Sequence, residues 1–278
     1  MIKITTIIEN NQGSHKGLKA EHGLSFYIET DTGGPILFDT GQGKGFLDNA
    51  AQLNIDLRHL GAVILSHSHY DHTGGLRYLL EKVKPPRLFV SNHFFRPKYQ
   101  KEGMRIEFLG NNFLPEELER QELNIIRVDE PLVEIQPGLY IITDFEATND
   151  FEKIDEPFFI FDNDRWVKDD FKDELALVAT TTRGLVIISG CAHAGIINII
   201  QRAVKVLERR EVRAVIGGMH LIGAGGDRLF KTAAALLALD VQHVGVSHCT
   251  GEAAGHYLKE VLGERVFFNT TGTTVIFD

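Results

Sequence analysis

The sequence predicts a mixed α/β fold, α+β in the segregation of its strands and helices, with two β-sheets packed face to face and helices outside. One observation and one physical argument carry this prediction. The chain falls into two blocks, each with strand-like runs first and helix-like stretches after them. Each element must bury its apolar side, and a sandwich of two sheets with outer helices does so for both blocks. At 278 residues the chain can bury a substantial core, and we expect one domain over residues 1–278.

The first block opens with short apolar runs of the kind that form buried strands. Its most uniformly apolar run covers residues 62–65, and a helix is expected after it at about 74–83, where leucines and a valine recur on one face. The expected strands of this block are 3–8, 25–29, 35–38 and 62–65.

The second block repeats the theme with more β-branched residues and longer helices. Its apolar runs again stop at small residues, which marks them as strands that end in loops. The expected strands are 175–179, 185–189, 214–216, 244–246, 266–268 and 273–277, and the expected helices are 196–210 and 228–239.

The region of about 92–173 is less regular and rich in aromatic residues. Strands at 125–128 and 139–143 belong to the core, and the stretches around them have the character of an insertion. Aromatic loops above a site commonly form a substrate wall or lid. The alternative is that they pack on the outer helices or at a dimer contact. The residues expected to contact substrate here are His93, Arg96, Phe158 and Trp166.

The charge balance narrows the class of partner. A net charge of −9 argues against a nucleic-acid backbone, which usually meets a clustered basic surface. A small anionic substrate stays compatible with it, since a local basic patch is available at Arg96, Lys98, Lys101 and Arg105.

Targeting and redox signals point to a cytoplasmic protein. The opening residues read as a first strand and not as a secretory signal, and no apolar run reaches the 18 residues of a membrane span. The two cysteines, Cys191 and Cys249, suit reduced thiols better than a disulfide.

The segment 66–75, Ser-His-Ser-His-Tyr-Asp-His-Thr-Gly-Gly, predicts a metal site. His67 and His69 lie at an i,i+2 spacing just past the strand at 62–65, so both point to one side and can bind one ion. Asp71 and His72 fall in the first turn of the following helix and can bind a second ion. The alternative, a solvated loop rich in histidine, does not explain the strand, loop and helix around it.

Three later segments share one design, in which an apolar strand ends in a small residue or cysteine and a histidine follows. Strand exits are where α/β proteins assemble active sites. We expect His193 to complete the first ion's ligands, His248 to bind the second ion, and His220 to be a further ligand or a proton donor. Cys191 is either a thiolate ligand or a small buried thiol beside the site.

Two further features each allow a functional interpretation and a purely structural one. Asp39 ends the strand at 35–38, where it could accept a hydrogen bond from a ligand imidazole or the ligand loop; the alternative is an aspartate that only forms a turn. The turn at 223–227 precedes a helix, so the amides of Gly225 and Gly226 could hold a phosphate, although glycine-rich turns are common.

On these residues the sequence resembles the metallo-β-lactamase superfamily. The resemblance rests on the His-x-His-x-Asp-His signature at 67–72 and on the strand-Asp-Thr-Gly element at Asp39, and it covers nearly the whole chain. Segments 189–195, 217–221 and 248–251 look like the branch similar to dihydropterin-ribofuranosylaminobenzene 5′-phosphate synthases. The resemblance implies a four-layer αββα sandwich with a two-metal site at the sheet edges.

The resemblance also implies how the metals are held. One divalent ion, zinc by expectation and manganese or iron as alternatives, is bound by His67, His69 and His193. The other is bound by Asp71, His72 and His248. Most superfamily members carry a bridging aspartate, often in a Gly-Asp pair, where this chain has Gly190-Cys191. Either Cys191 or His193 therefore stands in the bridging place.

These features predict a metal-dependent hydrolase in which a hydroxide activated by two metals attacks an ester, phosphoester or related small molecule. Asp71 and His220 would be catalytic, His220 as proton donor, with Asp39 in support.

The resemblance adds an alternative, a pterin-joining synthase of the transferase class. Phe158, Phe159 and Trp166 would then stack on a pterin ring, and the glycine turn would hold a phosphate. A second alternative is a non-catalytic metal-binding or redox protein. The expected partner is a small molecule, phosphorylated in the synthase case, with no nucleic acid and no membrane; the oligomeric state stays open, a dimer included.

Overall fold

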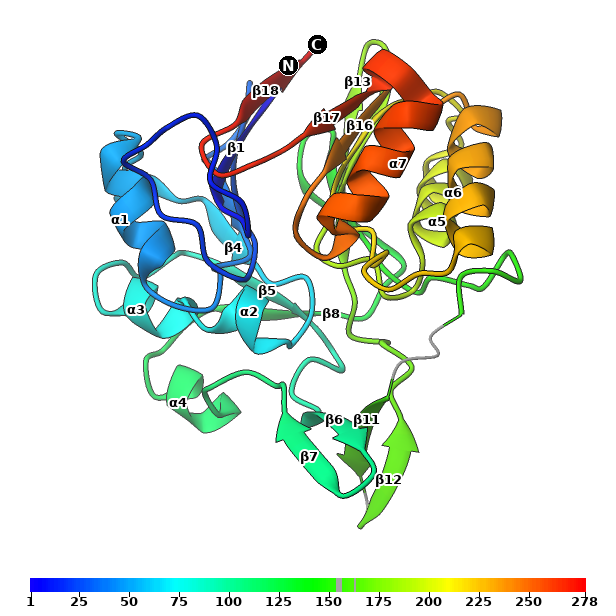
Figure 1. The fold of residues 1–278 in the computed structure, drawn as a ribbon. Helices are drawn as coiled ribbons and strands as arrows, with labels where there is room; N and C mark the ends of the chain where they lie inside the picture. Colours follow the sequence, from blue (N-terminus) through cyan, green and yellow to red (C-terminus); the bar gives the residue numbers. More distant parts are fainter. Residues whose placement is uncertain (154–156, 163) are drawn as a thin grey trace.

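Two seven-stranded sheets form the centre of the molecule (Figure 1). The computed structural model describes residues 1–153, 157–162 and 164–278. The first sheet contains, in spatial order, β18 (Thr274–Phe277), β1 (Ile2–Ile8), β2 (Ser25–Thr30), β3 (Ile36–Phe38), β4 (Ala62–Ile64), β5 (Leu88–Ser91) and β8 (Ile125–Val128). The second contains β17 (Val266–Phe268), β16 (His243–Val246), β15 (Val212–Gly217), β14 (Gly184–Ser189), β13 (Ala176–Thr181), β10 (Leu139–Ile142) and β9 (Leu132–Gln136).

Helices cover the outer face of each sheet, as Figure 1 shows. Those beside the first sheet are α1 (Gly45–Gln52), α2 (Tyr70–Thr73) and α3 (Leu76–Leu80), with α4 (Pro115–Glu119) below them. Those beside the second are α5 (Ile196–Leu207), α6 (Gly226–Ala238) and α7 (Glu252–Leu262). Short 3₁₀ turns are η1 (Leu57–His59), η2 (His248–Thr250) and η3 (Gly263–Arg265). The prediction of two sheets with helices outside is confirmed.

Three apolar clusters hold these layers together. The central one lies between the sheets, where Phe38 and Ile64 of the first sheet share a buried cluster with Ile188 of the second. Each outer cluster joins a sheet to its helices. In α5 the buried residues include Ile196, Ile199, Ile200 and Ala203, whose spacing of three and four places them on one face of the helix.

Parallel strands in both sheets bring their carboxyl ends to one side of the molecule. In the first sheet β3, β4, β5 and β8 run parallel, and in the second β14, β15, β16 and β17 do. The loops that follow these strands therefore meet at one edge of the sandwich, which is where ligands bind in open α/β sheets.

A third, four-stranded sheet projects from the sandwich, drawn in green at the bottom of Figure 1. It contains β12 (Arg165–Lys168), β11 (Phe158–Asp162), β6 (Lys98–Glu102) and β7 (Arg105–Phe108). We call it the small sheet. As predicted, the strands β8 and β10 belong to the main sheets. β9 between them also belongs to a main sheet, so the region 92–173 is not one continuous insertion.

The helix predicted at 74–83 is wrong in its bounds, because the chain forms two short helices, α2 and α3, around Gly74-Gly75. A Cβ at Gly75 would lie 2.1 Å from the carbonyl oxygen of Thr40, and one at Gly74 would lie 2.2 Å from that of Gln42. The glycines let the helical segment pass directly against the backbone after β3. This contact holds α2 at the exit of β3.

Candidate metal centre

The six residues predicted as metal ligands lie together at the carboxyl ends of the parallel strands, and each is at most 6% exposed. They come from the loop after β4, from α2, from the loop after β14 and from η2 after β16. The rings of His67 and His193 lie 5.0 Å apart, those of His67 and His72 4.3 Å, and those of His72 and His248 5.0 Å. The two halves of the sandwich therefore contribute to one centre.

His67, His69 and His193 form the first ligand set. One nitrogen from each lies within 4.8 Å of the others. Nε2 of His67, Nε2 of His69 and both ring nitrogens of His193 are buried and have no hydrogen-bond partner among the described residues. Burial lowers the pKa of all three imidazoles well below its usual value. Neutral, desolvated and otherwise unpaired imidazoles suit a zinc-type ion, whose bonds would replace the missing hydrogen bonds.

Asp71, His72 and His248 form the second ligand set. The Oδ2 atom of Asp71 lies 3.1 Å from Nε2 of His248 and 3.7 Å from Nε2 of His72. Burial opposes ionisation of Asp71, but the charge of His72 and hydrogen bonds from two histidines outweigh it and hold its pKa well below its usual value. Burial likewise opposes the charge on His72, but the Asp71 and Asp39 carboxylates raise its pKa to about 9.

His22 joins the second ligand set and was missed by the sequence analysis. Its Nε2 lies 3.2 Å from Oδ2 of Asp71, and its ring lies 5.0 Å from that of His248. Ligand atoms of these three residues lie within 4.8 Å of one another. The His22 side chain is 50% exposed, so it is the solvent-facing member of the centre. A single histidine in a polar loop carries no sequence signal of this role.

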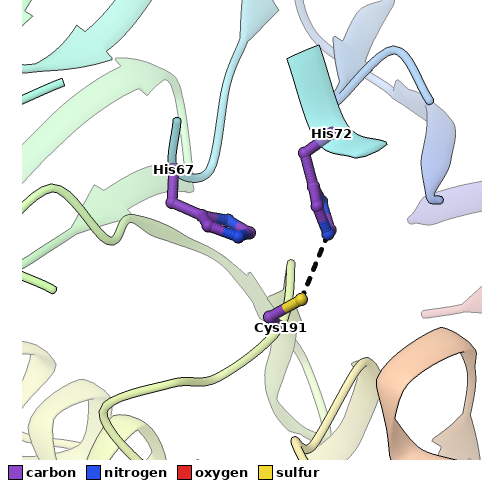
Figure 2. A group of neighbouring side chains, drawn as sticks. All are labelled: His67, His72 and Cys191. Carbon is purple, nitrogen blue, oxygen red and sulfur yellow. Dashed lines mark hydrogen bonds between the residues drawn. The ribbon is translucent and has the colours of Figure 1, made fainter. Parts of the chain in front are cut away.

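Cys191 lies between the two ligand sets (Figure 2). Its Sγ is 3.1 Å from Nε2 of His72, and it forms a group with His67 and His72 in which all ligand atoms lie within 4.8 Å. Both Cys191 and Cys249 are free and buried, and burial together with the neighbouring thiol raises the pKa of Cys191. His193 therefore groups with His67 and His69, while the Cys191 thiol lies between the two ligand sets, near His67 and His72.

Asp39 orients one ligand from each set. Its Oδ2 accepts a hydrogen bond from Nδ1 of His72 at 2.6 Å and from Oγ of Ser66 at 2.7 Å, while its Oδ1 accepts from the Ser66 amide at 2.7 Å. Oγ of Ser66 lies 2.9 Å from Nδ1 of His67. The Asp39 carboxylate is fully buried. Such contacts would fix the ring orientation of a histidine that ligates a metal, which is the role predicted for this residue.

Two further acidic residues support the ligand loops and were missed from the sequence. Glu9 accepts a hydrogen bond from the His248 amide at 2.5 Å, and Glu174 accepts from the amides of His193 and Ala194, each at 2.8 Å. Both carboxylates are 1% exposed. Each therefore fixes the backbone of a ligand-bearing loop.

The backbone of the centre adopts left-handed conformations at four residues with side chains. The φ angles are 60° at Asp39, 58° at Ala192, 48° at His220 and 49° at His248. Such angles are uncommon outside glycine and cluster at functional sites, because the surrounding contacts must hold them. Three of the four lie in the loops that directly follow the parallel strands β3, β14 and β15, and the fourth lies in η2 after β16.

Phe158 and His220 lie beside the first ligand set. The Phe158 ring is 5.6 Å from that of His69 and 5.7 Å from that of His193. The His220 ring is 4.3 Å from that of His193 and 6.1 Å from that of Phe158. Both residues therefore lie beside the first ligand set, and the roles of Phe158 as a substrate contact and of His220 as a further ligand or proton donor stay predictions.

The predicted aromatic stack of Phe158, Phe159 and Trp166 is wrong. Side chains alternate along β11, so Phe158 faces the centre while Phe159 faces the other side of the small sheet. Trp166 lies on that other side too, with its ring 5.1 Å from Tyr99 and 5.0 Å from Phe161. Only Phe158 of the three lies beside a ligand ring.

The basic patch predicted around Arg96 is also wrong, because Lys98 is buried. Lys98 is 1% exposed and pairs with two aspartates, while Arg105 pairs with Glu107 at 2.8 Å. Lys101 lies over the Trp166 ring, 5.2 Å from its centroid. Lys98, Lys101 and Arg105 are therefore buried, packed on an aromatic ring or paired with an acidic residue, and they do not form the expected basic surface.

The remaining predicted substrate residues lie outside both ligand sets. Arg96 approaches Asp170 at 3.7 Å, and His93 lines a cavity of about 250 Å³ with Phe171 and Glu174. Gly225 and Gly226 are exposed at the start of α6. Along the part of the chain that the structure describes, no helix has the length and apolar character to span a membrane.

The metal-free protein is expected to contain a glutamate that titrates near neutrality. Burial raises the pKa of Glu174 from 4.5 to about 7, against the two amide hydrogen bonds that lower it. The Glu174 carboxyl therefore ionises at a lower pH in the unfolded chain than in the folded one. The free energy of unfolding falls by roughly 3 kcal/mol as the pH rises from 4.5 through about 7. Carboxyl ¹³C NMR, with Glu174→Gln to assign the resonance, measures this pKa; a value near 4.5 would contradict the prediction.

Comparison with known proteins places these features in a family. Residues 18–195 match the sequence profile of the metallo-beta-lactamase superfamily. The chain is 34% identical over 275 residues to the 7,8-dihydropterin-6-methyl-4-(beta-D-ribofuranosyl)-aminobenzene-5′-phosphate synthase of Methanocaldococcus jannaschii, covering 95% of this chain and 92% of that protein.

Solved structures show the same architecture. The crystal structure of Tm1679, a metal-dependent hydrolase of the beta-lactamase superfamily, superposes with a TM-score of 0.85 at 30% identity, over 100% of this chain and 99% of that one. The metallo-beta-lactamase fold protein YhfI from Bacillus subtilis shares the fold at 13% identity, with a TM-score of 0.59 over 99% of this chain and 100% of that one.

Proposed function

This chain belongs to the metallo-beta-lactamase superfamily, and from that premise we propose that it is a metal-dependent enzyme that joins a dihydropterin to a ribofuranosylaminobenzene phosphate. One observation carries the metal dependence. The buried ring nitrogens of His67, His69 and His193 converge without hydrogen-bond partners among the described residues. Leaving several polar atoms buried and unpaired is costly, so the arrangement is explained by an ion that they bind.

The proposed ligands follow the two sets. His67, His69 and His193 would hold one divalent ion, and Asp71, His72 and His248 the other, with Cys191 between them. Imidazole, carboxylate and thiolate together favour zinc, with iron as the alternative that also accepts a thiolate and manganese as the weaker match. Ions held there would supply Lewis-acid activation of the substrate.

The chain's own residues supply position and proton control. Asp39 holds the His72 ring and Ser66 in place through short hydrogen bonds. His220, beside His193, is the candidate to donate a proton to the phosphate that leaves when its C–O bond breaks and the aminobenzene nitrogen bonds to the pterin methyl carbon. Phe158 presents an aromatic ring next to the first ligand set, where a planar pterin ring would pack against it.

The synthase reaction is supported by the similarity to the Methanocaldococcus jannaschii synthase, which extends over nearly the full length of both chains. Full-length similarity means that the strand exits and the small sheet fall within the compared region. A second candidate, hydrolysis of an ester or phosphoester, is supported by the likeness to Tm1679, a metal-dependent hydrolase. Both candidates use the same ligand sets and differ in whether an amine or water attacks.

A direct assay separates the two candidates. Metal-loaded protein is incubated with a phosphorylated dihydropterin and ribofuranosylaminobenzene 5′-phosphate, and separately with p-nitrophenyl esters, bis-p-nitrophenyl phosphate and lactones. Joined product detected by mass spectrometry and abolished by chelator supports the synthase. Chelator-sensitive hydrolysis without joining supports the hydrolase, and no turnover by metal-loaded protein would leave a non-catalytic metal-binding protein.

The Cys191→Ser variant is expected to lose the sulfur-to-cobalt charge-transfer absorption of the cobalt-loaded protein. This absorption requires a thiolate bound to the ion, and Cys191 is the thiol that lies among His67 and His72. Cys249→Ser is the comparison variant: the Cys249 thiol lies within 4.8 Å of ligand atoms of Cys191 and His248 but donates to the Cys191 carbonyl oxygen at 3.3 Å, so we expect this variant to keep the band. Near-ultraviolet spectra test the expectation, and persistence of the band in Cys191→Ser would contradict it.

A further inference from the structure

Lys98, the first residue of β6 in the small sheet, is buried beside the first ligand set. It is 1% exposed, which is rare for lysine unless the charge is paired. Its Nζ lies 2.5 Å from Oδ2 of Asp169 and 2.8 Å from Oδ1 of Asp173, and both carboxylates are buried as well. Burying three charges gains little stability over an apolar cluster of the same size. The contacts that this cluster makes beyond itself indicate another use.

The cluster of Lys98, Asp169 and Asp173 contacts the loop that carries His67 and His69. Oδ2 of Asp173 accepts hydrogen bonds from the Ser68 amide at 2.9 Å and from Oγ of Ser68 at 3.0 Å. Ser68 is the residue between the two histidines, so its amide plane sets how their side chains leave the backbone. The Lys98 ammonium therefore fixes the Asp173 carboxylate, and this carboxylate in turn binds the Ser68 amide.

A second arm reaches His193. Oδ1 of Asp169 accepts a hydrogen bond from the Phe171 amide at 2.9 Å, and the Phe171 ring stacks on the His193 ring at 3.9 Å with an interplanar angle of 10°. Nζ of Lys98 lies 4.3 Å from the centroid of the Phe171 ring, a cation–π distance. Phe171 has a φ of 49°, a strained angle for a bulky residue that these contacts hold in place.

The backbone of β6 adds a third connection. The Lys98 carbonyl oxygen accepts from the Leu109 amide at 2.9 Å, and the Leu109 carbonyl accepts from the amide of Tyr70, the first residue of α2, at 2.9 Å. An isolated bridge pairs Gly110 with His69. Side-chain and main-chain contacts at Lys98 therefore converge on the same ligand loop.

We infer that Lys98 is a positioning residue for the first metal ion, holding all three imidazoles of that ligand set in their binding arrangement and coupling them to the small sheet. Through Asp173 it fixes His67 and His69, and through Asp169 and Phe171 it fixes His193. The inference rests on the proposed function only in that a metal binds there. Contacts behind metal ligands typically contribute 10–100-fold to metal affinity.

The test measures binding of Co²⁺ and Zn²⁺ to the metal-free full-length protein by competition with a chelator, together with the visible spectrum of the cobalt protein. The variants are Lys98→Met, which keeps the length of the side chain, and Ser68→Ala, which removes one hydroxyl. The control is Arg202→Met, which removes another cation at 8% exposure, one that donates to the Thr143 carbonyl in the second half of the sandwich.

We expect Lys98→Met to weaken the first ion by about 10–100-fold and Ser68→Ala by a smaller factor, both with altered cobalt d–d bands, while Arg202→Met leaves affinity and bands unchanged. If Lys98→Met does not fold, Ser68→Ala decides. Wild-type affinity and spectrum in Ser68→Ala and in any folded Lys98→Met would overturn this inference alone. A wild-type protein that binds neither ion would overturn the proposed function as well.

Discussion

The His67→Ala variant is expected to lose the first metal ion and more than about 100-fold of its activity. Outer contacts of metal ligands already contribute 10–100-fold to affinity or activity, so removing a ligand costs more. His67 is fully buried, ring-to-ring with His69, His72 and His193, and its ring nitrogen Nε2 has no other partner among the described residues. Plasma mass spectrometry of the purified protein and turnover of the substrate identified by the assay measure both effects.

The control for this variant is His59→Ala. His59 lies in η1 before β4, is 76% exposed and contacts Asp56, which is in neither ligand set, so its loss should leave metal content and activity unchanged. Loss of less than tenfold activity in His67→Ala, with its metal content intact, would contradict the proposed centre. Loss of metal with unchanged activity would show that the ion is structural.

Asp39→Ala is expected to lower the free energy of unfolding by roughly 3–5 kcal/mol in the metal-free protein, because removing one partner of a buried charged pair leaves the other uncompensated. The carboxylate is fully buried and receives hydrogen bonds from His72, from the Ser66 amide and from the Ser66 hydroxyl. Alanine also tolerates the φ of 60° at this position less well than aspartate does. Urea unfolding monitored by circular dichroism measures the change.

Two variants separate the causes of that loss. Asp39→Asn keeps a side chain that tolerates the left-handed backbone, so it should lose the charge pairing with His72 but less of the backbone stability. Asp48→Ala removes an exposed aspartate paired with Lys19 and should cost less than about 1 kcal/mol. Equal stabilities of Asp39→Ala and Asp48→Ala would show that the Asp39 contacts contribute little.

The sequence was most informative about the strands and about the candidate ligands that directly follow them. The strands of both halves and the histidines at their exits could be read from it, because an apolar run followed by a polar ligand is a local pattern, and parallel strands bring such exits together. The grouping of His193 with His67 and His69 in space follows from this logic.

The supporting residues could not be predicted, because their burial depends on contacts far along the chain. Glu9 and His248 are separated by 239 positions and Ser68 and Asp173 by 105, and each acidic residue lies in a segment with no distinguishing pattern. Lys98 has the sequence context of a surface charge, and its burial depends on the distant residues Asp169 and Asp173. The alternation of Phe158 and Phe159 became visible only once residues 158–162 were known to form a strand.

The edge position of β18 has a consequence for synthesis and folding. β18 pairs with β1, and residues Ile2 and Phe277 are direct partners, so the sheet formed by the first half of the chain receives its outermost strand only after residue 274 has been made. Until then β1 presents an unpaired edge, the kind of edge on which chains associate wrongly. Such a long-range pairing raises the contact order, which slows folding.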